Sequence, residues 1–449
     1  MDKTAANEDV LLEWASQLRF SDLPASAVEA TLALILDHFT CIRLGLEMPW
    51  TQVLMRVARA DNSAETRALI NGTAGHGFDF DDLHFPTMSH PGCVVIPAAV
   101  AMGQETNATG HELIAAVAAG YELMLRPGIA AGLAYGELGW HATGVLGPLG
   151  AATAATKLLA GPDAVPDAVG LAASMGAGIK AFNEFGPGWV KRLHAGRAAE
   201  AGIFAARLAR DGYLGPRRAL SARFGLARVL GLGDADIGAL DRGLGDPFLV
   251  EDIYIKPYAA CGAVHGAVQA ATQIAATCPG LQERNIASVT VGISPRAIAQ
   301  NSNTDPADAM AAQYSTEVSV AIGLLGGAED PRRFMAAGDD SADPARVLAR
   351  RTVLELDHRA AAAYPDPNEG VVTVRLADGS SLSRRGSSSP ASSRGWQVAA
   401  SKFTAVSRGR LSPREVDEAL SACLQLAQEV GASALLAVLA RPASVTSSS

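Results

Sequence analysis

Apolar residues recur at every third or fourth position along most of the first 260 or so residues, which is the spacing of helices that bury at least one face. Leu11, Ala15 and Leu18 fall on one face of the first such segment, and Pro24 precedes the second. Turn signals separate the segments, and none of them alternates as a strand does. The helices predicted here cover residues 8–20, 25–45, 93–105, 109–126, 144–160, 164–180 and 196–212.

The pattern changes to strand alternation after about residue 280. Val289, Val291 and Ile293 alternate with small or polar residues, which predicts a strand with one buried face. Further on, an Asp-Gly pair between two alternating runs predicts a hairpin with a tight turn. The hairpin consists of strands 370–376 and 381–384 around Asp378-Gly379.

Helical patterning returns near the end of the chain, at 396–405 and 412–438, and we expect these helices to pack on the first helical region. A helical stretch around 308–326 lies among the strands, and the serine-rich residues 386–395 have the composition of a flexible linker. We therefore predict a mainly α protein with a large all-helical domain built from both chain ends and a smaller inserted α+β domain. The predicted boundaries are 1–265, 266–395 and 396–449.

Composition narrows the functional classes. The net charge of −9 and the lack of a long Lys/Arg run argue against nucleic acid as a partner. Five scattered cysteines without a CxxC pair argue against a zinc ribbon or a disulfide framework, so we expect a reducing cytoplasm. The polar N-terminus is unlike a signal peptide, and the apolar run 93–102 is too short to span a membrane. Glycine-rich phosphate loops are absent from the sequence, so we expect no nucleotide cofactor.

A cluster of titratable residues between Asn71 and Gly92 carries the strongest chemical signal. It holds the carboxylates Asp79, Asp81 and Asp82 and the imidazoles His76, His84 and His90. Such a cluster beside Gly and Pro is typical of a catalytic loop. A carboxylate such as Asp79 beside a histidine would raise the pKa of the imidazole and keep it charged. Two alternatives remain: Asp81 or Asp82 caps the next helix, or Asp and His bind a metal, although no spacing here is diagnostic of one.

Three further groups of polar residues stand where helices are predicted to begin. Lys191, His194 and Arg197 recur every third residue, which suits a clamp for a substrate carboxylate or, alternatively, a solvated basic edge. A carboxylate could also bind at the helix that His90-Pro-Gly precedes. The remaining candidates are His141, which by itself favours a structural role, and the set Lys256, Cys261 and His265 near the expected domain junction.

Together these residues resemble the 2-methylcitrate dehydratase family, MmgE/PrpD, and the resemblance covers nearly the whole chain in order. The family includes 2-methylcitrate dehydratases, cis-aconitate decarboxylases and an epimerase of iminodisuccinate. The matching residues are Asn71-Gly-Thr-Ala74, Asp79-Phe-Asp-Asp82, His90-Pro-Gly92, His141, Lys191, Leu193-His194, Gly196, Ala198-Ala199, Lys256-Pro-Tyr258, Cys261, His265, Trp396 and Lys402-Phe403.

The resemblance implies a homodimer that needs no metal or organic cofactor, with an active site between its two domains. The implied pocket residues are Asp79, His90, His141, Lys191, Lys256 and His265. The family's reactions alter a bond next to a carboxylate in a small polycarboxylate, and they build up enolate-like charge that cations can stabilise. We assign proton transfer to His90, His141 and Lys191 and the orienting of a histidine to Asp79. Lys256, Arg197, His194 and His265 are assigned to binding the substrate carboxylates.

Two departures from the decarboxylase branch bear on the reaction. Leu83 replaces a threonine of that branch and Val318 replaces a tyrosine, so two polar groups are missing. This favours the epimerase branch, with proton removal and return at the carbon α to a carboxylate of iminodisuccinate. A dehydratase or decarboxylase type of lyase is the alternative reaction, and a non-catalytic polycarboxylate-binding dimer is the alternative of another class.

Overall fold

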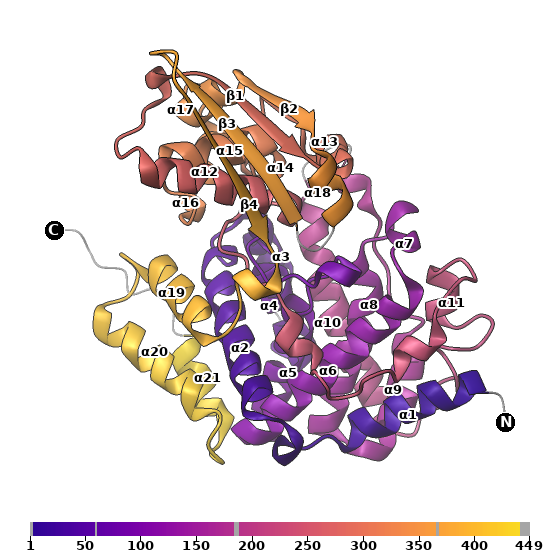
Figure 1. Ribbon diagram of the computed structural model, residues 1–449. Coiled ribbons are helices and arrows are strands. Elements are labelled where there is room, and N and C mark those ends of the chain that lie inside the picture. The colour runs from indigo at the N-terminus through magenta and orange to yellow at the C-terminus, as the bar shows by residue number, and fades with distance from the viewer. Residues whose placement is uncertain (1–2, 59–60, 184–187, 365–367, 441–449) are drawn as a thin grey trace. The chain divides into compact units, whose positions relative to one another are not determined.

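The computed structural model describes residues 3–58, 61–183, 188–364 and 368–440. Contacts divide the chain into two compact units (Figure 1). Unit 1 consists of Met1–Gly77, Asp81–Ile255 and Arg394–Ser449, and unit 2 consists of Phe78–Phe80 and Lys256–Ser393. This division passes from unit 1 to unit 2 after Ile255, whereas the sequence pattern placed the boundary after His265. It also assigns three residues of the titratable loop to unit 2.

Unit 1 is helical, and both ends of the chain contribute to it, as the hydrophobic pattern predicted. Near the C-terminus, the Cys423 thiol donates to the Leu32 carbonyl oxygen at 3.4 Å and Arg43 donates to the Leu439 carbonyl at 2.9 Å. Its helices are α1 Lys3–Gln17, α2 Ala25–Gly45, α3 Pro49–Val57, α4 Ala64–Gly75, α5 Gly92–Thr106, α6 Gly110–Ala131, α7 Ala134–Glu137, α8 Ala142–Leu159, α9 Val165–Ala172, α10 Trp189–Arg210, α11 Leu226–Leu230, α19 Trp396–Ser407, α20 Pro413–Gln425 and α21 Ala432–Leu439.

The core of unit 1 lies among α5, α6, α8 and α10, and it is rich in alanine and glycine. At the crossing of α6 and α8, a Cβ on Gly120 would lie 2.8 Å from the Gly150 carbonyl oxygen. Small residues therefore set the distance between these helices. By length and hydropathy α2 and α6 could each cross a membrane, but most of their residues are buried inside the unit. Their apolar character is accounted for by this packing.

Unit 2 is a four-stranded mixed sheet with helices against one face. The strand order is β2-β1-β3-β4, and only the β1–β2 pair is parallel among the described strands. Val289, Val291 and Ile293 are all buried, which confirms the predicted face. The elements are α12 His265–Thr277, β1 Ile286–Ile293, α13 Pro295–Asn301, α14 Ala309–Tyr314, α15 Thr316–Leu325, α16 Pro331–Asp339, α17 Pro344–Ala349, β2 Thr352–Leu356, α18 His358–Ala363, β3 Asn368–Leu376 and β4 Ser381–Ser388.

The predicted linker 386–395 is wrong in its first part, because β4 continues to Ser388 and pairs there with Asn368. A Cβ on Gly386 would lie 2.2 Å from the Gly266 carbonyl oxygen, so this glycine lets β4 approach α12 closely. The small residues that resembled a linker thus allow a strand to pack against a helix. The segment then turns through a short 3₁₀ helix at Pro390–Ser392.

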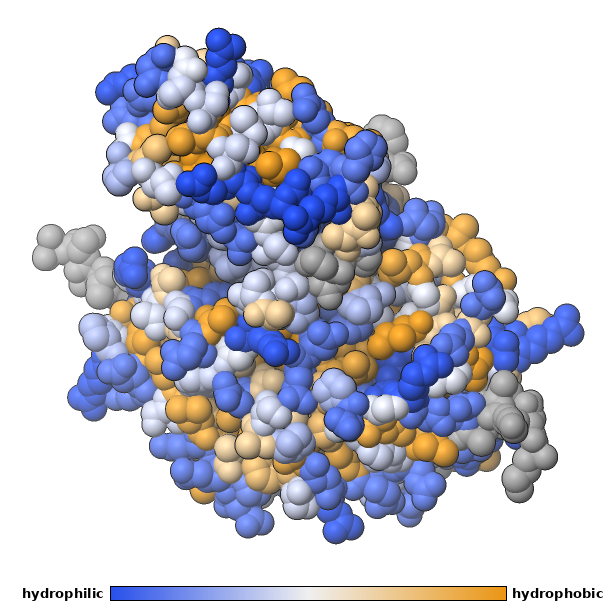
Figure 2. Space-filling view, in the orientation of Figure 1, coloured by the Kyte–Doolittle hydropathy of each residue, from blue (hydrophilic) through white to orange (hydrophobic). Residues whose placement is uncertain are grey.

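Several predicted helices also end or begin elsewhere. The one predicted at 164–180 ends at Ala172, and in the loop that follows Gly176 lies against the Val145 backbone and Gly178 against the His194 ring. The one predicted at 196–212 begins at Trp189, and the one predicted at 412–438 is two helices. On the face shown in Figure 2, hydrophilic and hydrophobic residues are interspersed over the surface of unit 1.

Candidate active site

The titratable loop joins α4 to α5, and most of it belongs to unit 1. His76 follows the last residue of α4, and isolated bridges Leu83–Tyr254 and His84–Ser89 fix the rest of the loop. All three histidines of the loop are buried. His84 shares a hydrogen bond with the Thr87 hydroxyl, and burial lowers its pKa to about 3, so it is a neutral part of the scaffold.

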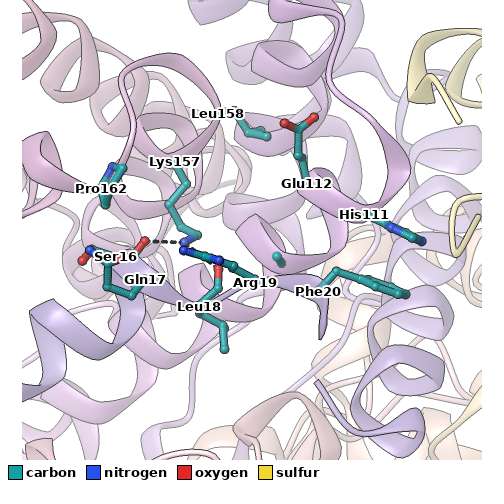
Figure 3. Close-up of a pocket in the computed structure, with 11 residues that line it drawn as sticks. Ser16, Gln17, Leu18, Arg19, Phe20, His111, Glu112, Lys157, Leu158 and Pro162 are labelled. Carbon is teal, nitrogen blue, oxygen red and sulfur yellow. Dashed lines mark hydrogen bonds between the residues drawn. The ribbon is translucent and has the colours of Figure 1, made fainter. Parts of the chain in front are cut away.

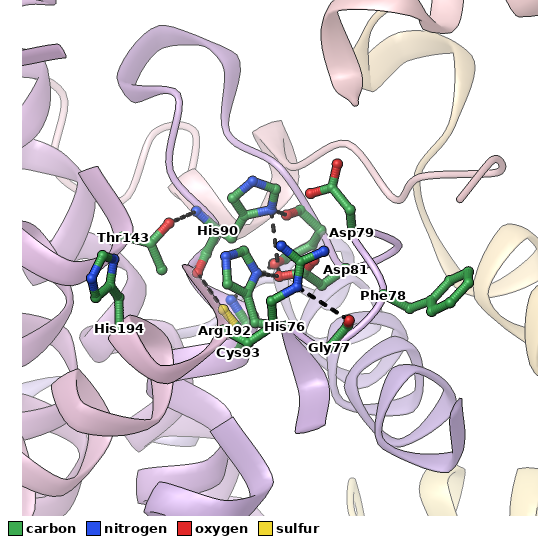
Figure 4. A network of polar contacts seen from close by, with 12 residues as sticks. His76, Gly77, Phe78, Asp79, Asp81, His90, Cys93, Thr143, Arg192 and His194 are labelled. Atoms are coloured by element: carbon green, nitrogen blue, oxygen red, sulfur yellow. Dashed lines mark hydrogen bonds and ion pairs between the residues drawn. The ribbon is translucent and has the colours of Figure 1, made fainter. Parts of the chain in front are cut away.

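Asp81 is the carboxylate placed against histidines in unit 1 (Figure 4). Its Oδ2 lies 2.7 Å from His76 Nδ1 and 3.4 Å from His90 Nδ1. His90 Nδ1 also lies 2.6 Å from the Asp82 carbonyl oxygen, which can only accept. The Nδ1 of His90 therefore carries the proton, and in the neutral ring the lone pair is at Nε2. Sequence reasoning gave the orienting role to Asp79, and the pattern held no signal to distinguish the two.

The first turn of α5 is capped by the protein itself. Gly92 N–H donates to Asp82 at 3.0 and 3.1 Å, and the Tyr121 hydroxyl donates to Asp82 Oδ2 at 2.8 Å. Burial raises the pKa of Asp82 to about 8, with further contributions from nearby Asp81 and Asp37. The helix terminus that we expected to receive a substrate carboxylate thus holds Asp82, which is the capping alternative.

The residues His76, Asp81 and His90 are also close enough to hold a metal ion, since their ligand atoms lie within 4.8 Å of one another. The fit is poor for the nitrogens nearest Asp81. His76 Nδ1 is already at hydrogen-bond distance from Asp81, and His90 Nδ1 must donate to the Asp82 carbonyl. A metal there would displace both hydrogen bonds, so the donor set fits a hydrogen-bonded trio better.

His141 and His194 form the second part of the site. Their Nδ1 atoms lie 3.1 Å apart, which joins the residue before α8 to the second turn of α10. The His141 ring also stacks on His76, with ring centroids 5.7 Å apart and 21° between the planes. His90 is close as well, since its ring centroid lies 4.8 Å from that of His76. Unit 1 therefore brings four imidazoles into one cluster.

Burial, together with the neighbouring titratable groups, keeps His141 neutral. Burial lowers its pKa well below the ordinary value, and His76, Lys191, His194 and His90 lower it further. Burial and the Lys191 charge also lower the pKa of His194. The sequence led us to expect a histidine held charged by a carboxylate, and for these two rings the structure gives the opposite result. Each neutral ring has one nitrogen lone pair that can accept a proton and one N–H that can donate.

The basic residues of α10 differ in how deeply their side chains are buried. Lys191 is buried, 4% exposed, and its charge acts on both His141 and His194. Arg197 lies on the exposed surface and pairs with Glu200, so the structure does not bring it into the buried cluster. Arg192, which we did not single out, is fully buried and donates to the carbonyls of Gly77 and Gly188 at 3.3 and 3.2 Å.

Unit 2 holds the other candidates. Lys256 Nζ donates to the Asp79 carbonyl oxygen at 3.0 Å and lies 3.3 Å from Asp79 Oδ1. Asp79 has a φ of +51°, an uncommon conformation for a residue other than glycine. Gln313, which sequence reasoning missed, donates to the carbonyls of Phe78 and Ala259, so it anchors the three-residue loop segment within this unit. His265 is buried, and its Nε2 donates to the Ala260 carbonyl at 3.0 Å.

The two residues that favoured an epimerase lie in packed surroundings. Leu83 is 2% exposed and packs with Phe85 and Tyr254 in a small apolar cluster of unit 1. Val318 is fully buried in α15 of unit 2. Packing accounts for both apolar side chains without reference to the reaction, so the choice between reactions needs other support.

A buried ion pair lies behind the loop in unit 1. Lys402 Nζ of α19 lies 2.6 Å from Asp37 Oδ1 of α2, and both side chains are at least 95% buried. Asp37 is one of the carboxylates that raise the pKa of Asp82, and Asp81 acts in turn on Lys402. The neighbouring His38 is neutral, because burial lowers its pKa to about 3. Hydrophobic periodicity marks this helix face only as buried, so it gave no signal for the pair.

A cavity of about 300 Å³ in unit 1 lies elsewhere, at the end of α1 (Figure 3). Lys157 Nζ donates there to the carbonyls of Ala15, Ser16 and Leu18 at 2.8–3.0 Å. Burial lowers the pKa of Lys157 to about 8. The ammonium caps the C-terminus of α1, and this use of its hydrogen bonds accounts for its burial.

Family models match both parts of the chain. The MmgE/PrpD N-terminal domain matches residues 9–237, and the MmgE/PrpD C-terminal domain matches residues 258–426. The chain belongs to the MmgE/PrpD family. The resemblance inferred from the motifs is thereby confirmed, as is the mainly α fold class.

Named members of the MmgE/PrpD family are similar to this chain at a distance. A cis-aconitate decarboxylase-like protein of Aspergillus oryzae is 28% identical over 324 residues, which is 63% of this chain and 65% of that protein. A cis-aconitate decarboxylase of Aspergillus terreus is 29% identical over 358 residues, 70% of this chain and 71% of that protein. The chain thus spans about two thirds of these relatives' lengths. They are enzymes by name, which supports an enzymatic role here.

Proposed function

We propose that this protein is an enzyme that moves a proton at a carbon next to a carboxylate of a small polycarboxylate, without an organic cofactor or a metal. The observation that supports this best is the cluster of four imidazoles beside the buried Lys191. A neutral imidazole offers a lone pair that can accept a proton from the substrate, and a buried ammonium can stabilise the enolate-like charge that develops.

Within this chemistry we place a lyase first, acting on a tricarboxylate of the cis-aconitate type. The two decarboxylase relatives support this choice. Loss of carbon dioxide leaves its bonding electrons on the substrate carbon, and a solvent-derived proton must then reach that carbon. Lys191 would stabilise the developing charge, and a histidine of the cluster would deliver the proton.

The second candidate is the epimerisation of iminodisuccinate, the reaction that the sequence comparison at positions 83 and 318 first suggested, although packing alone accounts for both apolar side chains. Epimerisation removes a proton from one face of the α-carbon and returns one to the other face, so it needs no hydroxyl to assist a leaving group. Both reactions use the same imidazole cluster, and isotope exchange distinguishes them. In the cell we expect the protein to act in the cytoplasm and as a homodimer.

The test uses cis-aconitate, 2-methylcitrate and iminodisuccinate in deuterated water. A lyase of the decarboxylase type should turn over cis-aconitate and place one deuterium in the product. An epimerase should instead place deuterium at the α-carbon of iminodisuccinate while its stereoisomers mix. If the protein binds these compounds by calorimetry but shows neither turnover nor exchange, it is a binder and the enzymatic proposal is wrong.

Lys191 provides a second test, with a matched control on the same helix. Lys191→Ala should lower kcat by about 100-fold, because one preorganised charge at the reacting atoms has an effect of that size. Arg210→Ala removes an exposed cation of α10 that pairs with Asp211, and it should leave kcat unchanged. Near-normal rates for Lys191→Ala would remove Lys191 from the chemistry.

A further inference from the structure

The contact between His141 and His194 joins two nitrogens of the same kind. Their Nδ1 atoms lie 3.1 Å apart, a hydrogen-bond distance. A hydrogen bond between two imidazole nitrogens needs a proton on one of them and a lone pair on the other. The two rings therefore adopt opposite tautomers, and a change of tautomer in one requires a change in the other.

A glycine loop holds both rings in this arrangement. The His141 backbone N–H donates to the Gly178 carbonyl at 2.9 Å. Gly178 has a φ of +133°, and a Cβ there would lie 2.9 Å from His194 Nδ1. The backbone at this point therefore lies directly against the His194 ring. One loop thus fixes the position of His141 and the orientation of its imidazole partner.

The pair leads from a buried group toward a partly exposed one. His141 is 5% exposed, whereas His194 is only half-buried. The Phe182 ring lies against both imidazoles, with centroid distances of 5.4 and 6.0 Å. An apolar ring on the pair limits access of water to the hydrogen bond itself, which favours transfer along that bond.

We propose that His194 is a proton relay, which passes protons between His141 and solvent during the reaction. When a proton enters His141 at Nε2, the Nδ1 proton of His141 moves to His194 Nδ1, and the Nε2 proton of His194 leaves to water. Both rings begin and end neutral, with their tautomers exchanged. Run in reverse, the same steps deliver one solvent proton to the substrate carbon.

Burial, together with the titratable groups that face His141, disfavours a charged His141 ring and so favours such a relay. His76 of the loop after α4, His90 before α5 and Lys191 and His194 of α10 all disfavour a positive charge on His141. A base in that position accepts a proton readily only if another proton leaves as the first arrives. This inference rests on the proposed function and replaces the carboxylate-binding role that the sequence suggested for His194.

The test compares two substitutions of His194 in the full chain. His194→Asn keeps a polar group near the Nδ1 position but cannot pass a proton on. His194→Ala removes the ring and leaves space that free imidazole can enter. We expect both variants to lower kcat at least tenfold with little change in KM. Added imidazole should raise the kcat of His194→Ala at least tenfold. It should not raise the kcat of wild type or of Arg210→Ala.

Each other outcome has a definite meaning. Near-normal kcat in His194→Asn overturns the relay, and that variant remains informative if His194→Ala does not fold. A raised KM with unchanged kcat and no imidazole effect would assign His194 to substrate binding instead. If wild type itself neither turns over nor exchanges any of the polycarboxylates, the proposed function is wrong, and the relay that rests on it is wrong too.

Discussion

The buried pair Lys402–Asp37 predicts a large and specific loss of stability. Replacing Lys402 by methionine keeps most of the side-chain volume but leaves the Asp37 carboxylate without its ammonium in a site that is 2% exposed. Breaking such a pair from one side costs about 3–5 kcal/mol, because an uncompensated charge remains buried. We expect the free energy of unfolding of unit 1 to fall by that amount in Lys402→Met.

The double variant Asp37→Leu/Lys402→Met separates this cause from lost packing. With both charges removed, most of the stability should return, because well-packed apolar residues often replace a buried pair at little cost. The single variant should also lose more stability at pH 8 than at pH 5. Its lone carboxyl would have a raised folded-state pKa, so the stability gained by protonation is lost as pH rises through that value.

Tryptophan fluorescence in urea suits this measurement, since all five tryptophans (14, 50, 140, 189 and 396) belong to unit 1. The signal therefore reports the unfolding of this unit alone. Glu418→Gln, which breaks an exposed pair with Arg414 on α20, is the matched control and should change stability by less than about 1 kcal/mol. A loss of under 1 kcal/mol in Lys402→Met would refute the reasoning that the pair is buried and mutually dependent.

Three further predictions concern the site. The lowered pKa of His141 predicts that the acid limb of the kcat/KM profile lies below pH 6.5, the ordinary histidine value, and a limb above it would exclude His141 as the base. Gly178→Ala should lower kcat about 10- to 100-fold, because the added Cβ displaces His194. Gly161→Ala is the control: Gly161 also has a positive φ, but a Cβ there meets nothing within 4 Å, so only stability should fall. Equal kcat values in the two variants would contradict the prediction. Burial raises the pKa of Asp82 from 3.8 to about 8, so its protonated form contributes stability that is lost as pH rises from about 4 to 8. Asp82→Asn should therefore make the free energy of unfolding in urea less dependent on pH over this range.

The sequence predicted the architecture well where a single physical rule decides it. Helical periodicity located the core helices, and the Asp378-Gly379 turn located the hairpin. The sequence-based prediction failed where small residues allow close packing, because the segment around Gly386, which packs against α12, has the composition of a linker. A composition rule cannot distinguish a glycine that is free from one that lies against a neighbouring helix.

In the site, too, the residues could be predicted better than their contacts. Residue types and motif order pointed to His90, His141, Lys191 and Lys256, and the structure buries all four side chains, while their roles stay predictions. The pairings were not predictable, because Asp79, Asp81 and Asp82 are nearly equivalent in sequence. Their different partners, Lys256, His76 and Gly92, depend on how the loop turns in space. For the same reason no signal in the sequence indicated the contact of Tyr121 with Asp82 or the pairing of Lys402 with Asp37.

The return of the C-terminal helices to unit 1 has a consequence for the synthesis of the protein. Asp37 and Lys402 are more than three hundred residues apart, so at about 5–20 residues per second the ribosome needs roughly 20 to 70 s to supply the second after the first. During that time α2 is already outside the ribosome, but α19, which covers Asp37 and part of its apolar face in the folded protein, has not yet been made. A nascent chain paused after unit 2 should therefore recruit chaperones, and release should follow once α19 has left the ribosomal tunnel.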